Sequence, residues 1–203
     1  MKIICIGRNY IQHAEELNNP VPEKPIFFLK PDSALLKNDK PFFLPEFSND
    51  VHYETEVVVR IKKLGKYIEE QFAPKYYDAI ALGVDFTARD LQAECKKKGL
   101  PWEMAKAFDQ SAVLSEFIEL DSEDNIQDIN FSCKINGEQR QKGNTSEMLF
   151  SVNRIIAYVS QFMTLKIGDL IYTGTPAGVG KVNIGDHLEG FIEDKKMFDF
   201  KIK

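Results

Sequence analysis

The feature that most constrains the fold of this chain is the run Val51–Ile61, which reads VHYETEVVVRI. Because the run is rich in β-branched and aromatic residues, it predicts a strand. Side chains alternate between the two faces of a strand, so Glu54 and Glu56 share one face with His52. Two carboxylates at this spacing lie about 7 Å apart and repel each other unless positive charge lies between them. A hard cation such as Mg²⁺ fits that pair, although a half-exposed strand with an acidic outer face has the same pattern.

A second predicted strand supplies a third carboxylate. Residues 79–85 read AIALGVD, an almost wholly apolar run that ends in Asp85. An acid at the end of a buried strand costs free energy unless it is paired or bound to a cation. We therefore predict that Asp85 joins the glutamate pair in a functional site. The next helix is predicted to begin with a capping box from Thr87 to Asp90 and to end at Gly99, with its positive end near the carboxylate.

The N-terminal region of the chain holds a candidate catalytic pair. A buried strand over Lys2–Ile6 is predicted to lead into a helix that Asn9 caps and that runs to about Leu17. On this helix His13 and Glu16 are three residues apart and therefore side by side. A carboxylate beside an imidazole fixes its tautomer and raises its basicity, which suits a general base that activates water. An ordinary surface ion pair has the same spacing.

Two lysines stand in apolar surroundings. Lys30 ends a short apolar strand, where a lysine can reach an anionic ligand, and Lys106 stands between apolar neighbours, which favours a semi-buried ammonium with a partner. Residues 32–50 look irregular and include the apparently exposed pair Phe42-Phe43. This segment is either a flap over the substrate or a long connection.

The second half of the chain is predicted to supply structural elements that support the fold. Asn136-Gly137 is a strong hairpin signal, and Ser151 is placed to cap an amphipathic helix. The glycine-rich segment 174–180 lacks the lysine spacing and the following helix of a phosphate-binding loop. It predicts a tight turn that can also offer Thr175 and backbone N–H groups to a carboxylate.

Composition excludes several classes of partner. The chain has 203 residues and a net charge of -5, so it has no basic field for nucleic acid or an anionic membrane. The only basic cluster, Lys96-Lys97-Lys98, falls at a predicted helix C-terminus, where the macrodipole accounts for it. No apolar run is long enough for a membrane span or a signal sequence, and three cysteines without metal spacing predict reduced thiols. We expect a cytoplasmic protein with one domain over residues 1–203, in which residues 1–50 carry the helix with the catalytic pair and, if the irregular segment is a flap, a lid.

Four segments occur in the order and at the separations found in the fumarylacetoacetate hydrolase family. They are Gly7–Glu16, His52–Glu56, Asp85–Asp90 and Gly174–Gly180. The sequence most resembles the short acylpyruvase branch, the fumarylacetoacetate hydrolase domain-containing proteins, and the run Asp90–Lys106 is especially similar. The resemblance covers essentially the whole chain.

The resemblance implies a mainly β fold with a few helices (α+β), a mixed β-sandwich roll, assembled as a homodimer. It implies Mg²⁺ or Mn²⁺ held by the residues that match Glu54, Glu56 and Asp85. The implied catalytic residues are His13, Glu16 and Lys106, with the helix of the first two ordered when a lid closes over the ligand. The implied substrate-binding residues are Arg8, Lys30, Gln92 and Thr175. The sequence departs from the family pattern at residues 108–111, which bears on substrate choice.

The function that follows is divalent-metal-dependent hydrolysis of a C–C bond in acylpyruvates or other 2,4-dioxo acids through a metal-stabilised pyruvate enolate. His13, oriented by Glu16, is predicted to take a proton from the water that attacks the acyl carbonyl. One alternative is oxaloacetate decarboxylation, which needs the same enolate and no water. Another is isomerisation, tautomerisation or hydration of unsaturated 2-oxo diacids such as 2-hydroxyhepta-2,4-diene-1,7-dioate. A non-catalytic binding protein is disfavoured, because buried carboxylates without a cation cost several kcal/mol.

Overall fold

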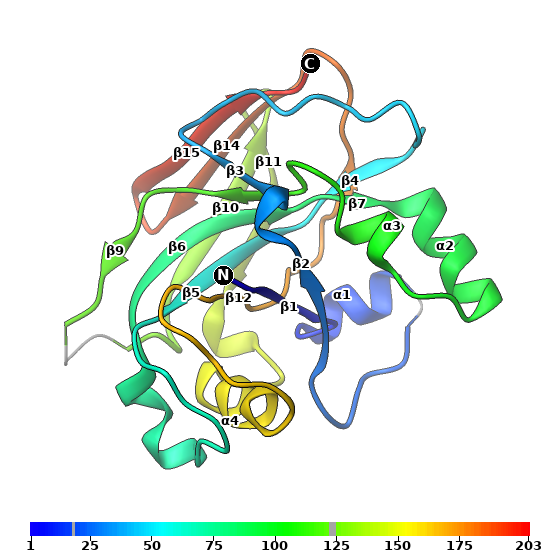
Figure 1. Cartoon of the computed structure of the whole chain (residues 1–203). Helices are drawn as coiled ribbons and strands as arrows, with labels where there is room; N and C mark the ends of the chain where they lie inside the picture. Colours follow the sequence, from blue (N-terminus) through cyan, green and yellow to red (C-terminus); the bar gives the residue numbers. More distant parts are fainter. Residues whose placement is uncertain (18, 122–124) are drawn as a thin grey trace.

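The computed structural model describes residues 1–17, 19–121 and 125–203, and strands dominate these ranges (Figure 1). The strands are β1 (Ile3–Gly7), β2 (Ile26–Lys30), β3 (Leu35–Lys37), β4 (Val51–Tyr53), β5 (Thr55–Ile61), β6 (Tyr77–Asp85), β7 (Thr87–Ala88), β8 (Ala112–Leu114), β9 (Ile118–Glu119), β10 (Asn130–Ile135), β11 (Glu138–Asn144), β12 (Leu170–Tyr172), β13 (Gly180–Lys181), β14 (His187–Ile192) and β15 (Lys195–Lys201). The α-helices are α1 (Ile11–Glu16), α2 (Arg89–Lys98), α3 (Glu103–Lys106) and α4 (Val152–Phe162). Short 3₁₀ helices span Asp32–Ala34, Glu70–Tyr76 and Thr145–Glu147. No helix in these ranges is long and apolar enough to cross a membrane.

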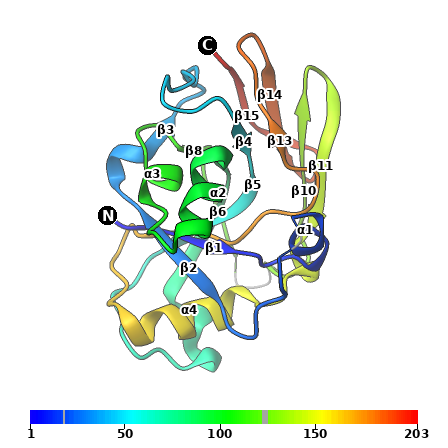
Figure 2. The ribbon, with the colours of Figure 1, turned by 90° about the vertical axis from the view of Figure 1, so that its right-hand side faces the viewer.

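The strands of the described residues form three sheets. The largest has the order β2-β1-β12-β5-β6-β8-β3, with β9 paired to β6. A second sheet has the order β11-β10-β14-β15, and a small third sheet has the order β13-β4-β7. Pairing is antiparallel except between β1 and β12 and between β3 and β8, so the fold is the predicted mixed β-sandwich roll. Figure 2 shows the second sheet on one side of β5 and β6, and α2 and α3 on the other.

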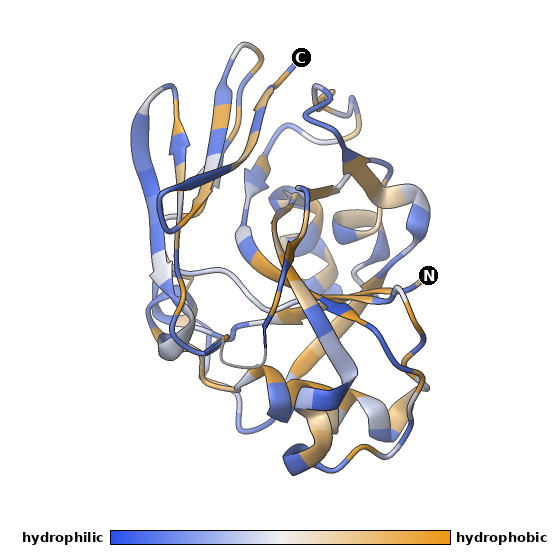
Figure 3. Cartoon of the chain, turned by 90° about the vertical axis from the view of Figure 1, so that its left-hand side faces the viewer, coloured by the Kyte–Doolittle hydropathy of each residue, from blue (hydrophilic) through white to orange (hydrophobic). Residues whose placement is uncertain are grey.

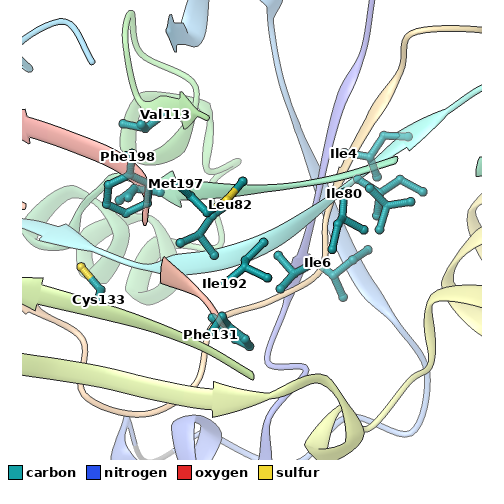
Figure 4. Close-up of a cluster of buried hydrophobic side chains, with 14 of the residues drawn as sticks. Ile4, Ile6, Ile80, Leu82, Val113, Phe131, Cys133, Ile192, Met197 and Phe198 are labelled. Atoms are coloured by element: carbon teal, nitrogen blue, oxygen red, sulfur yellow. The ribbon is translucent and has the colours of Figure 1, made fainter. Parts of the chain in front are cut away.

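The main core lies where the largest sheet faces the second one. Ile6 and Leu82 of the largest sheet lie in one cluster with Phe131 and Phe198 of the second, and all four are buried (Figure 4). A smaller cluster that includes Val58 covers the opposite face of the largest sheet. Because β5 and β6 are buried on both faces, their sequences are almost continuously apolar. The second sheet has an outer face in solvent, and its strands alternate polar and apolar residues (Figure 3).

The structure corrects the predicted bounds of two elements near the site. The single strand expected over residues 51–61 is two strands, β4 and β5, with Glu54 in the break between them. Helix α1 begins at Ile11 and not after an Asn9 cap; the Asn9 side chain instead bonds to the backbone of Phe150 and Thr173.

The capping box expected from Thr87 to Asp90 does not form. Thr87 lies in β7, and Ala88 is the residue before the first turn of α2. The Asp90 carboxylate bonds to the Ser48 hydroxyl and to the backbone N–H groups of Asn49 and Leu91. The Asp90 carboxylate therefore joins the first turn of α2 to the preceding loop at Ser48 and Asn49.

Two predictions about structural elements in the second half of the chain are confirmed. The hairpin at Asn136-Gly137 is confirmed, with both residues at positive φ, and Ser151 does cap α4 by accepting from Arg154 N–H. The expected exposure of Phe42-Phe43 is wrong for Phe42, which is fully buried and stacks on Phe86 with 3.9 Å between ring centroids, and confirmed for Phe43, which is exposed. This stacking fixes residues 40–44 against the main core.

Candidate metal centre and active site

Strand pairing brings the three predicted carboxylates together. In the antiparallel pair of β5 and β6, Thr55 lies opposite Val84, and the next step of the register places Asp85 N–H 2.8 Å from the carbonyl oxygen of Glu54. Glu56 lies two residues further along β5, opposite Gly83. One carboxylate oxygen of each acid lies within 4.8 Å of the others, and all three side chains are buried.

Lys106 joins two of these acids. Its ammonium donates to Oε2 of Glu54 at 2.7 Å, to Oδ2 of Asp85 at 2.8 Å and to Oγ1 of Thr87 at 2.5 Å. Helix α3 is short, and its last residue is Lys106, so the side chain enters the site from the end of the helix. The predicted partner of this semi-buried lysine is thus the acidic cluster itself.

Two more cations surround the acids. Arg89, in the first turn of α2, donates to Oε1 of Glu54 at 2.6 Å and to Oε1 of Gln92 at 2.7 Å. Lys30 lies behind Asp85, with its ammonium 2.7 Å from Oδ1, and it donates to the carbonyl oxygens of Phe86 and Ser111. Lys30 is buried and does not line the cleft in this structure, so its predicted substrate contact stays a prediction.

The charges of the acids are unevenly compensated. Burial opposes ionisation of Glu54, but the Lys106 and Arg89 cations outweigh it and hold the pKa of Glu54 well below its ordinary value. Glu56 has only the backbone N–H of Gly174 as a hydrogen-bond donor among the described residues, at 2.7 Å. Burial, followed by the negative charges of Asp85 and Glu54, raises its pKa well above the ordinary value.

The residues present fit a hard divalent cation. The carboxylate oxygens have the separation of ligands that share one ion, and oxygen donors are the type that Mg²⁺ and Mn²⁺ prefer. Asp85 Oδ1 makes no well-aligned hydrogen bond to any described residue, although the Lys30 ammonium is near, so this buried oxygen retains a free lone pair. A bound cation would also supply the positive charge that Glu56 lacks.

The predicted pair His13 and Glu16 faces this cluster from α1. His13 is buried, and its Nδ1 lies 3.5 Å from Oε2 of Glu16, a long contact. The Glu16 carboxylate also accepts from the backbone N–H of Gly178. Burial, opposed by the charge of Glu54 and the contact with Glu16, lowers the pKa of His13. A neutral imidazole at neutral pH is the form that a general base needs.

A narrow cleft, partly open to solvent, connects these groups. Its walls include the three acids, His13, Lys106, Gln92, Thr175, Arg8, Arg89 and Lys96. Of the predicted site residues, the buried Lys30 and the exposed Glu16 are not part of the lining, and the others are.

Sequence reasoning missed Arg89 and Gln141. The signal for Arg89 was its place in the first turn of a helix, where a cation opposes the macrodipole and therefore needs a nearby acid. Gln141 accepts from Thr55 N–H and donates to Thr175 Oγ1 and to the carbonyl oxygen of Pro176, so it holds the Thr175 segment against β5. Gln141 lies in a uniformly polar strand, so nothing in the sequence distinguishes it as a site residue.

The fold and the site together define a mixed-β protein with a buried three-carboxylate centre in an open cleft. The fumarylacetoacetate (FAA) hydrolase C-terminal pattern matches residues 2–202. The chain belongs to the fumarylacetoacetate hydrolase family.

Named relatives cover nearly the whole chain. It is 43% identical to the mitochondrial oxaloacetate tautomerase FAHD1 of Mus musculus, over 99% of this chain and 91% of the relative. It is 44% identical to the mitochondrial oxaloacetate decarboxylase of Dictyostelium discoideum, over 93% of this chain and 87% of the relative. Fumarylpyruvate hydrolase from Pseudomonas aeruginosa, solved in complex with Mn²⁺ and pyruvate, has a TM-score of 0.94 at 34% identity, over 100% of this chain and 89% of that one.

Proposed function

We propose that this chain is a divalent-metal-dependent enzyme that acts on small 2-oxo acids, with oxaloacetate as its first candidate substrate. The observation that carries the proposal is the convergence of three buried carboxylates beside Lys106 and Arg89 in an open cleft. The names of the relatives support it, because they refer to oxaloacetate or fumarylpyruvate.

The proposed ligand set for Mg²⁺ or Mn²⁺ is Glu54, Glu56 and Asp85. Such an ion, when bound, stabilises negative charge on the 2-oxo oxygen of a substrate. Tautomerisation moves a proton between C3 and that oxygen, and decarboxylation breaks the C3–C4 bond; both develop charge at the same place. Lys106 is proposed to stabilise this charge; in support, its ammonium lies 2.7 and 2.8 Å from carboxylate oxygens of two of the acids that would hold the ion.

The other residues have roles in binding and proton transfer. Gln92, Arg8 and Thr175 line the cleft and are proposed to hold the 2-oxo acid. Arg89 fixes both Glu54 and the amide of Gln92, so it is proposed as a positioning residue for ligand and substrate contacts. His13 is the proposed proton carrier, oriented by Glu16.

Hydrolysis of acylpyruvates is the second candidate function, and the dyad favours it. Decarboxylation needs no base for water, whereas a buried imidazole of lowered pKa beside a carboxylate suits water activation. His13 would take the proton of a water that attacks the C4 carbonyl, after which the C3–C4 bond breaks. Isomerisation of unsaturated 2-oxo diacids is a third reaction of the same centre.

The test is turnover of oxaloacetate and acetylpyruvate side by side, with Mg²⁺ or Mn²⁺ and then with excess chelator. Enol loss without pyruvate formation indicates tautomerisation, pyruvate with CO₂ indicates decarboxylation, and pyruvate with acetate indicates hydrolysis. Chelator-insensitive turnover, or none on these substrates and on unsaturated 2-oxo diacids, would overturn the proposal. The homodimer and the cytoplasmic location stay predictions; the Mus musculus relative is named as mitochondrial.

A further inference from the structure

Two cations that line the cleft have no acidic partner among the residues that the structure describes. Arg8 makes no hydrogen bond or ion pair with any residue that the structure describes, although its side chain lines the cleft. Its backbone has φ of 60°, a conformation that costs free energy for a residue other than glycine. The neighbouring Asn9 enforces this turn through its three hydrogen bonds to Phe150 and Thr173.

The second cation is Lys96, which shares one face of α2 with two site residues. Arg89, Gln92 and Lys96 are separated by three and four positions, so their side chains form a stripe along the helix. All three line the cleft, and Lys96 is the farthest along the helix from Arg89, which bonds to Glu54. Its ammonium lies 5.6 Å from the centroid of the Trp102 ring and donates to Oδ1 of Asn19 at 3.3 Å. No carboxylate of the described residues pairs with it.

Arg8 and Lys96 therefore bring positive charge to the cleft wall that no acid of the described residues pairs with. Lys106 and Arg89 are engaged by the acids, whereas Arg8 and Lys96 are not. Partial burial, followed by the charges of Arg8 and Arg89 and opposed by that of Glu54, lowers the pKa of Lys96. Holding such groups together without an anion is unfavourable, so the arrangement is suited to a negatively charged ligand group.

We propose that Lys96 and Arg8 form a subsite for the second carboxylate of a dicarboxylic 2-oxo acid, and that Lys96 is a specificity-determining residue. This inference rests on the proposed function, which places the 2-oxo acid end of the substrate at the three acids. The helix macrodipole is then not the whole reason for the lysine cluster at the end of α2. Lys98 pairs with Glu94, and Lys97 does not line the cleft.

Oxaloacetate and acetylpyruvate differ only at the end of the molecule that the proposed subsite would contact. Both present the same 2-oxo acid end, but oxaloacetate ends in a carboxylate where acetylpyruvate ends in an acetyl group. The oxygen anion of one is replaced by a methyl group of similar size in the other. A charge-assisted contact with Lys96 can therefore form with oxaloacetate alone.

The experiment compares the wild type with Lys96→Met and with the matched control Lys97→Met. We expect Lys96→Met to lower the ratio of kcat/KM for oxaloacetate to that for acetylpyruvate about tenfold, as loss of one half-exposed charge-assisted hydrogen bond predicts. Lys97→Met should leave the ratio unchanged. Thermal stabilisation of the metal-loaded protein by oxalate, which has no second end, should be the same in all three proteins, and stabilisation by oxaloacetate should fall in Lys96→Met.

The outcomes separate the subsite from the reaction. Turnover with an unchanged ratio in Lys96→Met would overturn the subsite and leave the proposed function intact. Without wild-type turnover, a selective loss of oxaloacetate stabilisation in Lys96→Met would support the subsite while the proposed function fails. An equal fall in Lys97→Met would show a general field effect and would also overturn the subsite.

Discussion

The carboxylate of Glu16 accepts from the backbone N–H of Gly178, at 3.1 and 3.3 Å from its two oxygens, across 162 positions of the chain. The same carboxylate contacts His13, so this backbone group holds the orienting member of the dyad. Helix α1 has six residues and no side-chain cap, and a helix this short has little stability of its own. The position of the imidazole therefore depends on the glycine-rich segment 174–180.

Gly178→Ala tests this dependence. Gly178 has φ of 96°, and an added Cβ would lie 2.2 Å from the carbonyl oxygen of Arg140, so the segment must shift and its N–H must leave Glu16. We expect acetylpyruvate hydrolysis to fall about tenfold or more and amide hydrogen exchange in residues 11–16 to accelerate.

Gly185→Ala is the matched control for that variant. Gly185 has the same φ of 96°, but its added Cβ meets nothing within 4 Å. It shares the backbone strain and lacks the clash, so it should keep the exchange rate of α1. Similar rates of exchange and turnover in both variants would show that Gly178 does not position the dyad.

Glu56→Gln should reduce the loss of stability that the metal-free protein undergoes as pH rises. The pKa of Glu56 is raised in the folded state, so the folded protein binds more protons than the unfolded chain above pH of about 4.3, the ordinary glutamate value. Stability then falls as pH rises through this window up to the folded pKa. The neutral amide that replaces the carboxyl group does not titrate, so the variant lacks this loss of stability. In urea unfolding with chelator, the free energy of unfolding of the wild type should fall further below that of the variant as pH rises. A constant difference would contradict the raised pKa.

The convergence of the acids could be predicted because its signals are local. Alternation along residues 51–61 relates Glu54 to Glu56, and an apolar run that ends in an acid identifies Asp85. The pairing register of β5 and β6, a tertiary property, is what closes the cluster. The break at Glu54 escaped prediction, because β4 pairs in a different sheet from β5.

The hydrogen-bonding roles of polar residues were the hardest to predict. Asn9 and Thr87 have the residue types of helix caps, but their partners are distant in sequence: Asn9 bonds to Phe150, and Thr87 accepts from Lys106. A capping preference is worth only about 1 kcal/mol, so buried tertiary partners override it. Phe42 was misplaced for a similar reason, since only the folded chain brings Phe86 to it.

Lys106→Met should destabilise the metal-free protein strongly. The variant leaves buried carboxylates of Glu54 and Asp85 without the ammonium that bonds to both, which costs about 3–5 kcal/mol for a buried pair. Mg²⁺ should recover more stability in this variant than in the wild type, because it restores positive charge to the acids. Urea unfolding with and without Mg²⁺ measures both effects.

The control for Lys106→Met is Lys98→Met, which removes an exposed lysine paired with Glu94 one helical turn away. We expect no measurable change in its unfolding free energy, because exposed pairs of this kind contribute little. If Mg²⁺ fails to rescue Lys106→Met more than the wild type, the acids are not the binding site of the ion.

His13→Ala should separate hydrolysis from decarboxylation. The variant removes the proposed base for water, so acetylpyruvate hydrolysis should fall about 10²- to 10⁴-fold, whereas oxaloacetate decarboxylation, which needs no water, should change much less. Burial lowers the pKa of His13 from its ordinary value of 6.5, so the base is free at neutral pH and wild-type hydrolysis should decline only at lower pH. The pH profile of the residual activity of His13→Ala should lack this decline of kcat/KM at low pH. The control variant Glu15→Ala, which changes an exposed residue on α1, should keep it. Full hydrolysis in His13→Ala, or an unchanged decline at low pH, would remove His13 from the reaction.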